Sequence, residues 1–330
     1  MSERRPDLPA EIAEAMQRAR KLAWISIGFL ISIVAAMALV MGGSQAMRTA
    51  WIEDMLSLLP PIAFLIALRL ESKPATAKFP FGFYRANSLA FLIAATALTA
   101  MGALLLYEAA STLIMREHPT IGTANLFGHE IWMGWLMIAV LVYSVIPPIV
   151  LGRLKKPVAA KIADKVLHTD ALMNAADWQT GLAGILGILG VAFGLWWADA
   201  VAAGFISLSI LADGLKSMRS SIYELIDGAP RKIDGPDVDP LVHRLVEQLK
   251  EVHGDVNIQV RETGRYMRAV IEPPDRPHVS GEHARRLIGN DEAWRLIEVA
   301  VEQRDDQPKR EKSASGVGAG NVPVADRAGS

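Results

Sequence analysis

Residues 22–41 read LAWISIGFLISIVAAMALVM and contain no charged side chain. The hydrocarbon core of a bilayer is crossed by a helix of about 20 apolar residues, so this stretch is long enough to span a membrane. It is too long for the apolar region of a signal peptide, and no cleavage site of small residues is placed to release it. We therefore expect it to be retained as a membrane-spanning helix.

Five further apolar runs follow the first. They lie at about 44–70, 86–114, 131–151, 166–190 and 198–214, separated by charged segments or segments with Gly and Pro. The net charge of −1 and the 21% of charged residues would suit a soluble protein, so the class follows from this clustering. The pattern predicts six transmembrane helices within residues 22–229. Pro60-Pro61 and Pro147-Pro148 predict kinks in two of them.

Basic residues gather in the segments on one side of the predicted spans. Those between the fourth and fifth spans are Arg153, Lys155, Lys156, Lys161 and Lys165. The segments on the opposite side carry only Arg48 and Arg116. Because cytoplasmic loops are rich in Lys and Arg, both termini are expected in the cytoplasm, with the loop at about 115–130 outside. The prediction is a multi-pass protein of the cell (inner) membrane, with the lipid bilayer as its surroundings.

The fifth predicted span begins with the polar stretch HTDALMNAAD, residues 168–177. Asp170, Asn174 and Asp177 stand at i, i+4 and i+7, so they share one face of a helix. A carboxylate at the centre of a bilayer costs roughly 2.5–3.5 kcal/mol on insertion scales, and such residues usually mark an ion or proton pathway. This face therefore predicts a cation pathway. His168 lies on roughly the opposite face and is a weaker candidate ligand.

After the last span the composition becomes that of a small soluble domain, residues 230–304. Residues 238–251 show helical periodicity, and two stretches of alternating apolar residues around Thr263-Gly264 predict a hairpin. A second helix from about Gly281 to Gln303 would complete an αββα, ferredoxin-like domain of the α+β class. Residues 1–21 are expected to be a cytoplasmic N-terminal segment, and residues 305–330 a disordered tail. The fold class is thus an all-α membrane domain followed by this domain.

Several motifs, in their order and spacing, resemble the cation diffusion facilitator family over about residues 20–300. They are FGFYRANS at 81–88, DALMN at 170–174, ADA at 198–200 and LIDGAP at 225–230. The resemblance implies that a divalent metal is carried outward in exchange for protons by a homodimer whose cytoplasmic domains pair. It implies no prosthetic group, no enzymatic activity and no nucleic-acid partner.

The chain departs from the metal site that this resemblance implies, which makes it an atypical member. Counting along the sequence places Glu53 and Ser57 where the family has two acidic residues, and Val166 where it has a His. The accessory His positions are Phe83, Val256 and Val270 here. Candidate metal ligands are therefore Glu53, Asp54, Asp170, Asn174 and Asp177, with Ser57 and His168 as weaker ones. Glu53 and Asp54 point about 100° apart on a helix, so one of them is expected to face the metal.

The chemistry of these ligands bears on the cargo. The chain has no Cys, and sites made only of oxygen favour harder ions such as Mn²⁺, Mg²⁺ or Fe²⁺ over Zn²⁺. The sequence leaves Mn, Fe, Zn, Co and Mg open. Two other readings remain: a non-transporting membrane sensor or scaffold on the same fold, and an intramembrane metalloenzyme. The second is disfavoured because no HExxH or related pair occurs.

Overall fold

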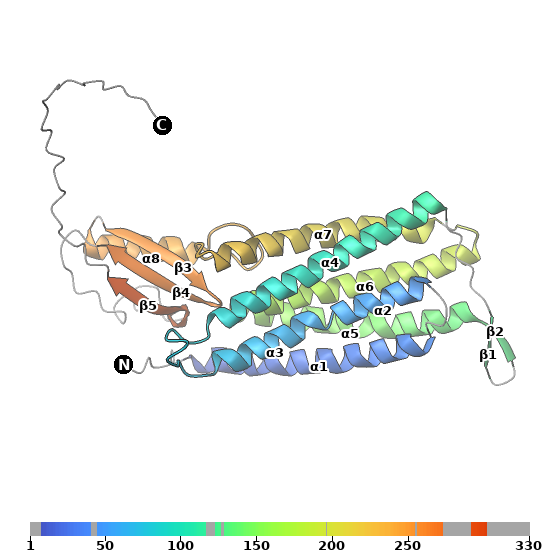
Figure 1. Cartoon of the computed structure of the whole chain (residues 1–330), viewed down its shortest axis with the longest axis horizontal. Coiled ribbons are helices and arrows are strands. Elements are labelled where there is room, and N and C mark those ends of the chain that lie inside the picture. Colours follow the sequence, from blue (N-terminus) through green and yellow to red (C-terminus); the bar gives the residue numbers. More distant parts are fainter. Residues whose placement is uncertain are drawn as a thin grey trace, which may run out of the picture.

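The computed structural model describes residues 8–40, 45–116, 123–126, 129–195, 197–254, 256–272 and 292–301. Helices lie side by side in a long bundle, and a small domain sits at one end (Figure 1). The bundle consists of α1 (Ala10–Val40), α2 (Gln45–Leu56), α3 (Leu59–Glu71), α4 (Arg85–Met115), α5 (Met133–Lys161), α6 (Lys165–Ala192) and α7 (Ala198–Leu225). The predicted N-terminal segment is thus helical from Ala10 onward, as the first part of α1.

Five helical stretches of the described residues are long and apolar enough to cross a membrane. They are Ala10–Leu39, Trp51–Glu71, Arg85–Met115, Gly134–Lys161 and Ala200–Leu225. Helix α6, the fifth of the six expected spans, is 28 residues long but is not among them. Its length corresponds to about 42 Å at 1.5 Å per residue. The crossing of the bilayer by α6 stays a prediction.

Close to Pro60-Pro61, where the sequence predicted a kink, the second spanning stretch divides into α2 and α3 at Ser57-Leu58. Prolines have no N–H group, so Pro60 and Pro61 cannot donate helical hydrogen bonds to the carbonyls of Leu56 and Ser57. By contrast, α5 continues through Pro147 and Pro148 as one helix.

Helices α4 and α7 pack very closely. A Cβ atom at Gly102 of α4 would lie 2.6 Å from the backbone nitrogen of Leu211 in α7. One at Gly214 of α7 would lie 2.7 Å from the backbone of Thr99 in α4. Small residues allow such backbone contact between membrane helices.

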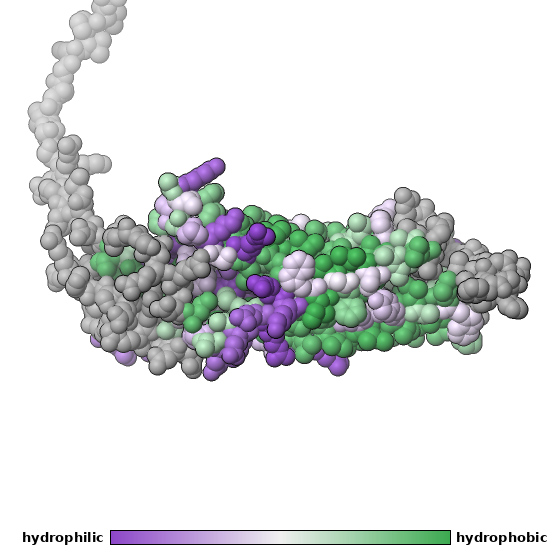
Figure 2. Space-filling view, turned by 90° about the horizontal axis from the view of Figure 1, so that it is seen from below, coloured by the Kyte–Doolittle hydropathy of each residue, from purple (hydrophilic) through white to green (hydrophobic). Residues whose placement is uncertain are grey.

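The outside of the bundle is apolar. Figure 2 shows a hydrophobic surface along the bundle and hydrophilic residues gathered toward the end where the small domain lies. Exposed large apolar side chains include Ile31, Leu104, Ile146, Leu186 and Phe205. Water-soluble monomers seldom expose apolar patches of this extent, whereas lipid tails cover them without cost.

A short antiparallel hairpin, β1 (Thr123–Leu126) and β2 (His129–Trp132), lies at the opposite end of the bundle from the small domain (Figure 1). The start of α1 lies at the same end as the small domain. The two ends of the bundle therefore differ as the predicted topology requires, although which end is cytoplasmic stays a prediction.

The small domain contains α8 (Pro240–His253), β3 (Asn257–Thr263), β4 (Tyr266–Glu272), the 3-10 turn η1 (Ala293–Arg295) and β5 (Leu296–Val301). The sheet has the order β3-β4-β5, in which β3 and β4 are antiparallel and β4 and β5 are parallel. Its core is formed by Leu241, Leu245 and Leu249 of α8 and by Val256, Met267, Ala269, Ile271 and Leu296. The first helix and the hairpin of the sequence prediction are present.

The prediction of a second helix from Gly281 to Gln303 is wrong where the structure describes it. Residues 293–295 form a 3-10 turn, and residues 296–301 form the third strand of the sheet. The stretch LIEVAV is rich in β-branched residues, which pack well on a pleated sheet beside β4. Residues 281–291, 302 and 303 of the expected helix and the predicted tail at 305–330 lie outside the described residues.

Candidate functional site

Helix α6 carries most of the candidate ligands and lies in the middle of the bundle. It packs against α3, α4, α5 and α7. Residues 164–171 are all buried. The carboxylate of Asp164 accepts a hydrogen bond of 2.8 Å from the backbone N–H of Leu167, so it caps the N-terminus of α6. Polar side chains of this helix are therefore held inside the protein rather than against lipid.

Asp177 faces the break between α2 and α3. The hydroxyl of Ser57 donates a hydrogen bond of 2.7 Å to Oδ1 of Asp177, and Oδ2 is buried without a hydrogen-bond partner among the described residues. An unpartnered oxygen of a buried carboxylate is expensive, so the geometry suits a bound cation or a proton. Ser57, one of the weaker candidate ligands of the sequence prediction, thus contacts Asp177, one of the stronger candidates.

Further carboxylates lie within electrostatic range of this region. Glu53 is buried and lies within electrostatic range of Asp177, Asp54 and Glu108. We call Glu53, Asp54, Glu108 and Asp177 the outer layer. Glu108 on α4 was not among the predicted ligands, although a carboxylate inside an apolar run is the signal that could have identified it.

Asp170 has a different neighbour. Its Oδ2 lies 2.7 Å from the Nζ of Lys155 in α5, and Lys155 also donates a hydrogen bond of 2.8 Å to the hydroxyl of Ser26 in α1. The Lys155 side chain is 0% exposed and that of Asp170 is 2% exposed. The prediction that Lys155 lies in the segment between the fourth and fifth spans is wrong, because α5 continues to Lys161.

The candidate ligands on α6 therefore fall at two depths. Asp170 and Asp177 are seven residues apart, which is about 10 Å along the helix axis. Asn174 lies between them, is buried, and donates a hydrogen bond of 3.0 Å to the backbone oxygen of Asp170. We call Asp170, Lys155 and Ser26 the inner layer. Val166, four residues before Asp170, is buried in an apolar cluster.

His168 faces away from both layers. It lines a cavity of about 390 Å³ together with Lys156, Asp213, Lys216 and Asp234. The sequence expectation that His168 lies opposite Asp170 agrees with this placement. A ligand role for His168 beside Asp170 stays a prediction without a contact to support it.

Among the residues that the structure describes, no group of three or more His, Asp or Glu side chains is close enough to hold a metal ion. The side chains that are brought together directly are Ser57 with Asp177 and Lys155 with Asp170. The ligand set Glu53, Asp54, Asp170, Asn174 and Asp177 thus stays a prediction. A metal would need these helices to move closer together.

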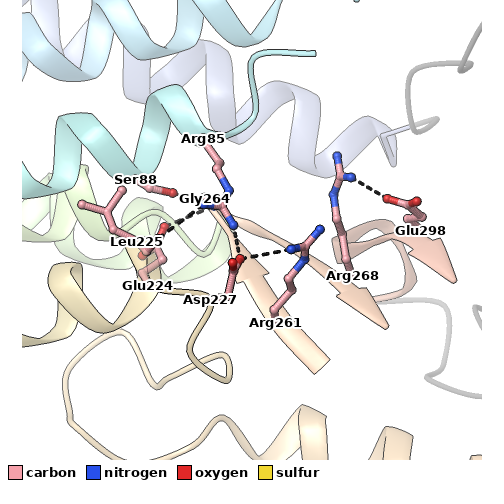
Figure 3. A network of polar contacts seen from close by, with 9 residues as sticks. All are labelled: Arg85, Ser88, Glu224, Leu225, Asp227, Arg261, Gly264, Arg268 and Glu298. Carbon is pink, nitrogen blue, oxygen red and sulfur yellow. Dashed lines mark hydrogen bonds and ion pairs between the residues drawn. The ribbon is translucent and has the colours of Figure 1, made fainter. Parts of the chain in front are cut away.

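Hydrogen bonds and ion pairs connect the small domain to the bundle near the start of α6. The backbone N–H of Gly264, at the β3–β4 turn, donates to Ser88 at 3.0 Å and to Glu224 at 3.1 Å (Figure 3). Arg85 and Arg261 both ion-pair with Asp227, which follows α7. Contacts from α4, α7 and β3 therefore converge at one junction.

Comparisons with known proteins match this architecture. The sequence model described as the cation efflux transmembrane domain matches residues 22–226. The manganese efflux system protein MneS of Bacillus subtilis is 26% identical over 221 residues, 64% of this chain and 72% of MneS. The probable cation efflux system protein Rv2025c of Mycobacterium tuberculosis is 29% identical over 222 residues, 67% of this chain and 63% of Rv2025c.

A third relative is an antiporter by name. The cadmium, cobalt and zinc/H(+)-K(+) antiporter of Bacillus velezensis is 26% identical over 190 residues, 57% of this chain and 56% of the antiporter. The matched region of the family covers the helical bundle from residue 22 of α1 to the end of α7, including both layers of α6. The reading as a metalloenzyme is thereby set aside, and the resemblance found in the sequence is confirmed. The chain is an integral membrane protein that belongs to the cation efflux family, whose members are metal-cation transporters and not enzymes.

Proposed function

We propose that this protein exports a hard divalent cation, foremost Mn²⁺, by alternating access and in exchange for protons. The observation that carries the proposal is Asp177, a half-buried carboxylate with a buried Oδ2, which Ser57 holds at 2.7 Å beside the break between α2 and α3. Glu53 and Asp54 lie in electrostatic range of it. A divalent ion would balance the negative charge of this outer layer.

The choice of ion follows from the donor atoms. Carboxylates, an amide and a hydroxyl offer only oxygen ligands to an ion, and such sites suit Mn²⁺, Mg²⁺ or Fe²⁺ better than Zn²⁺. His168, the nearest imidazole on α6, faces a separate cavity. The name of MneS, a manganese efflux protein, supports Mn²⁺ among these ions. Zn²⁺ and Co²⁺ remain the competitors to test.

Proton exchange follows from the chemistry of carboxylates. Metal binding requires ionised ligands, and an empty buried carboxylate is stabilised by a proton, so one site can bind the two alternately. The name of the Bacillus velezensis antiporter supports proton coupling in a relative. The break at Ser57-Leu58 offers a place where the α2 half of the span could move relative to α3.

Further proposals concern the setting. The protein would lie in the cell (inner) membrane with both termini in the cytoplasm, as a homodimer. Its membrane domain would comprise residues 22–229 and its cytoplasmic domain residues 230–304. The alternative, a sensor or scaffold that binds metal without moving it, differs in one measurable respect, which is metal flux.

Purified protein in sealed proteoliposomes tests the proposal. We would measure uptake of Mn²⁺, Fe²⁺, Co²⁺, Ni²⁺, Zn²⁺ and Mg²⁺, with a pH-sensitive dye inside the vesicles. Flux of Mn²⁺ with opposite movement of protons is expected, and Asp177→Asn should abolish it. Asp237→Asn, at a 71% exposed side chain, is the matched control. Metal binding without flux in the wild type would favour the sensor, and full flux in Asp177→Asn would overturn the site.

A further inference from the structure

We propose that Lys155 is a tethered counter-cation, which holds Asp170 while the metal pathway is empty and which a metal ion displaces. The inference rests on the proposed transport function and deepens it. A buried ammonium group repels a metal ion, so its presence beside candidate metal ligands needs an explanation, and the proposed role provides one. Lys155 is a positioning residue here, since it acts on the metal through Asp170.

The geometry of the inner layer joins three helices through one ammonium group. Lys155 of α5 lies 2.7 Å from Oδ2 of Asp170 in α6 and donates at 2.8 Å to Ser26 in α1. Both charged side chains are removed from solvent. Breaking a buried ion pair is strongly unfavourable unless another charge replaces the lost one. A divalent cation is such a charge for Asp170.

Ser26 explains how the ammonium could leave Asp170 without becoming unpaired. The lysine stem is flexible, and its ammonium has three donors that can be shared among acceptors. The Ser26 hydroxyl is fully buried and already accepts one of these hydrogen bonds. Ser26 can therefore retain the ammonium when Asp170 turns toward a metal.

The two layers of α6 differ in charge. Among the ion pairs of the described residues, none involves Glu53, Asp54 or Asp177, whereas Asp170 has Lys155. Lys155 also acts electrostatically on Asp177 at the next depth. Its positive charge must therefore oppose a metal ion in either layer. The metal ion is therefore bound more weakly and released more easily. A transporter needs this property, because a site that binds its ion too tightly does not release it.

The central experiment compares Mn²⁺ binding and transport in full-length variants. Lys155→Met keeps the length of the side chain and removes its charge. We expect it to bind Mn²⁺ at least tenfold more tightly in isothermal titration calorimetry, with a lower KM and a several-fold lower maximal flux in proteoliposomes. Lys155→Arg keeps the charge and should retain wild-type affinity. Lys156→Met, the neighbour that lines the His168 cavity, is the matched control and should change neither value.

A structural role for Lys155 would give a different pattern. Unchanged Mn²⁺ affinity in folded Lys155→Met would overturn the proposal, as would equal losses of affinity in Lys155→Met and Lys155→Arg. If Lys155→Met does not fold, Ser26→Ala decides the matter. It leaves the ion pair but removes the acceptor that would retain the displaced ammonium, so it should weaken Mn²⁺ binding a few-fold, and unchanged binding would overturn the proposal.

The same measurements separate this inference from the proposed function. Wild-type protein that binds Mn²⁺ but does not transport it would end the transport proposal, while tighter binding in Lys155→Met would still support the counter-cation. If the wild type transports Mn²⁺ and Lys155→Met binds it with unchanged affinity, the transport proposal stands and the counter-cation proposal is overturned. Binding of no metal by wild type and by Lys155→Met would overturn both.

Discussion

Arg265, at the tip of the β3–β4 hairpin, ion-pairs at 2.8 Å with Asp164, the residue that caps the N-terminus of α6. The same guanidinium lies 3.1 Å from Glu71 at the end of α3, and its side chain is 0% exposed. Asp164 also accepts a hydrogen bond of 2.8 Å from Asn87 of α4. The small domain therefore contacts the helix that carries the candidate ligands at the point where that helix begins.

The first prediction concerns Arg265. Arg265→Ala would leave Asp164 and Glu71 buried without their cation, and removing one partner of a buried pair typically costs about 3–5 kcal/mol. We expect a marked fall in the unfolding midpoint in detergent and faster hydrogen exchange in the β3–β4 hairpin. Arg244→Ala breaks an exposed pair with Glu292 and should cost less than about 1 kcal/mol. Equal midpoints for the two variants would contradict a docking role for Arg265.

The second prediction is a pH dependence at the same junction. Glu262 of β3 lies 2.5 Å from Lys165 at the start of α6. Burial raises the pKa of Glu262 above its usual 4.5, and the charge of Lys165 opposes this only in part. A carboxyl whose pKa is raised by folding adds stability while it is protonated. That stability is full below pH 4.5 and is lost as the pH rises through the folded pKa.

Glu262→Gln cannot lose a proton, so it should lack this part of the pH dependence. The unfolding midpoints of wild type and variant would be compared between pH 4 and pH 8. We expect the wild type to lose stability relative to Glu262→Gln as the pH rises. Two parallel curves over the whole range would exclude a contribution from Glu262.

The parts of the fold that the sequence predicted are those that depend on local pattern. Long apolar runs such as residues 22–40 form helices because their backbone groups must be satisfied within the segment. Lys155 could not be placed in this way, since its depth depends on a partner in the next helix, Asp170. β5 was missed because a mostly apolar run of six residues is too short for its periodicity to distinguish a strand from the end of a helix.

The third prediction concerns topology. The C-terminal end of α4 and helix α8 lie toward opposite ends of the molecule (Figure 1). Arg116 directly follows α4, and Arg244 belongs to α8. The chain contains no Cys, so single-cysteine variants can be made without removing others. A membrane-impermeant maleimide should label Arg116→Cys on intact cells, and Arg244→Cys only after the cells are opened. Labelling with the opposite sidedness would reverse the orientation.

The fourth prediction is that zinc does not stabilise the small domain. Val256 is buried in its apolar core, and Val270 occupies the other position where a hairpin His was expected. A ligand at one hundred times its Kd stabilises a fold by about 2.7 kcal/mol. Hydrogen exchange of the full-length protein, with zinc and with chelator, should show no such change in β3 and β4. Strong zinc-dependent protection there would point to a site that the sequence did not reveal.

The last prediction concerns the stability of Asp170 variants. Because Lys155 is wholly buried against Asp170, Asp170→Ala leaves an uncompensated ammonium inside the bundle. We expect a loss of about 3–5 kcal/mol, together with the loss of transport. The double variant Lys155→Met, Asp170→Ala replaces the pair by apolar groups, which is often neutral or stabilising. Its unfolding midpoint should therefore return toward that of the wild type.

Transport measurements on the two single variants and the double variant distinguish the pairing of Lys155 with Asp170 from the binding of a metal ion by Asp170. The double variant should be folded but inactive, because it regains packing without regaining a carboxylate for the metal. Thermal unfolding in detergent and Mn²⁺ flux in proteoliposomes would be measured on the same preparations. Additive destabilisation by the two substitutions would show that Lys155 and Asp170 do not interact in the folded protein. Wild-type flux in the double variant would instead remove Asp170 from the metal pathway.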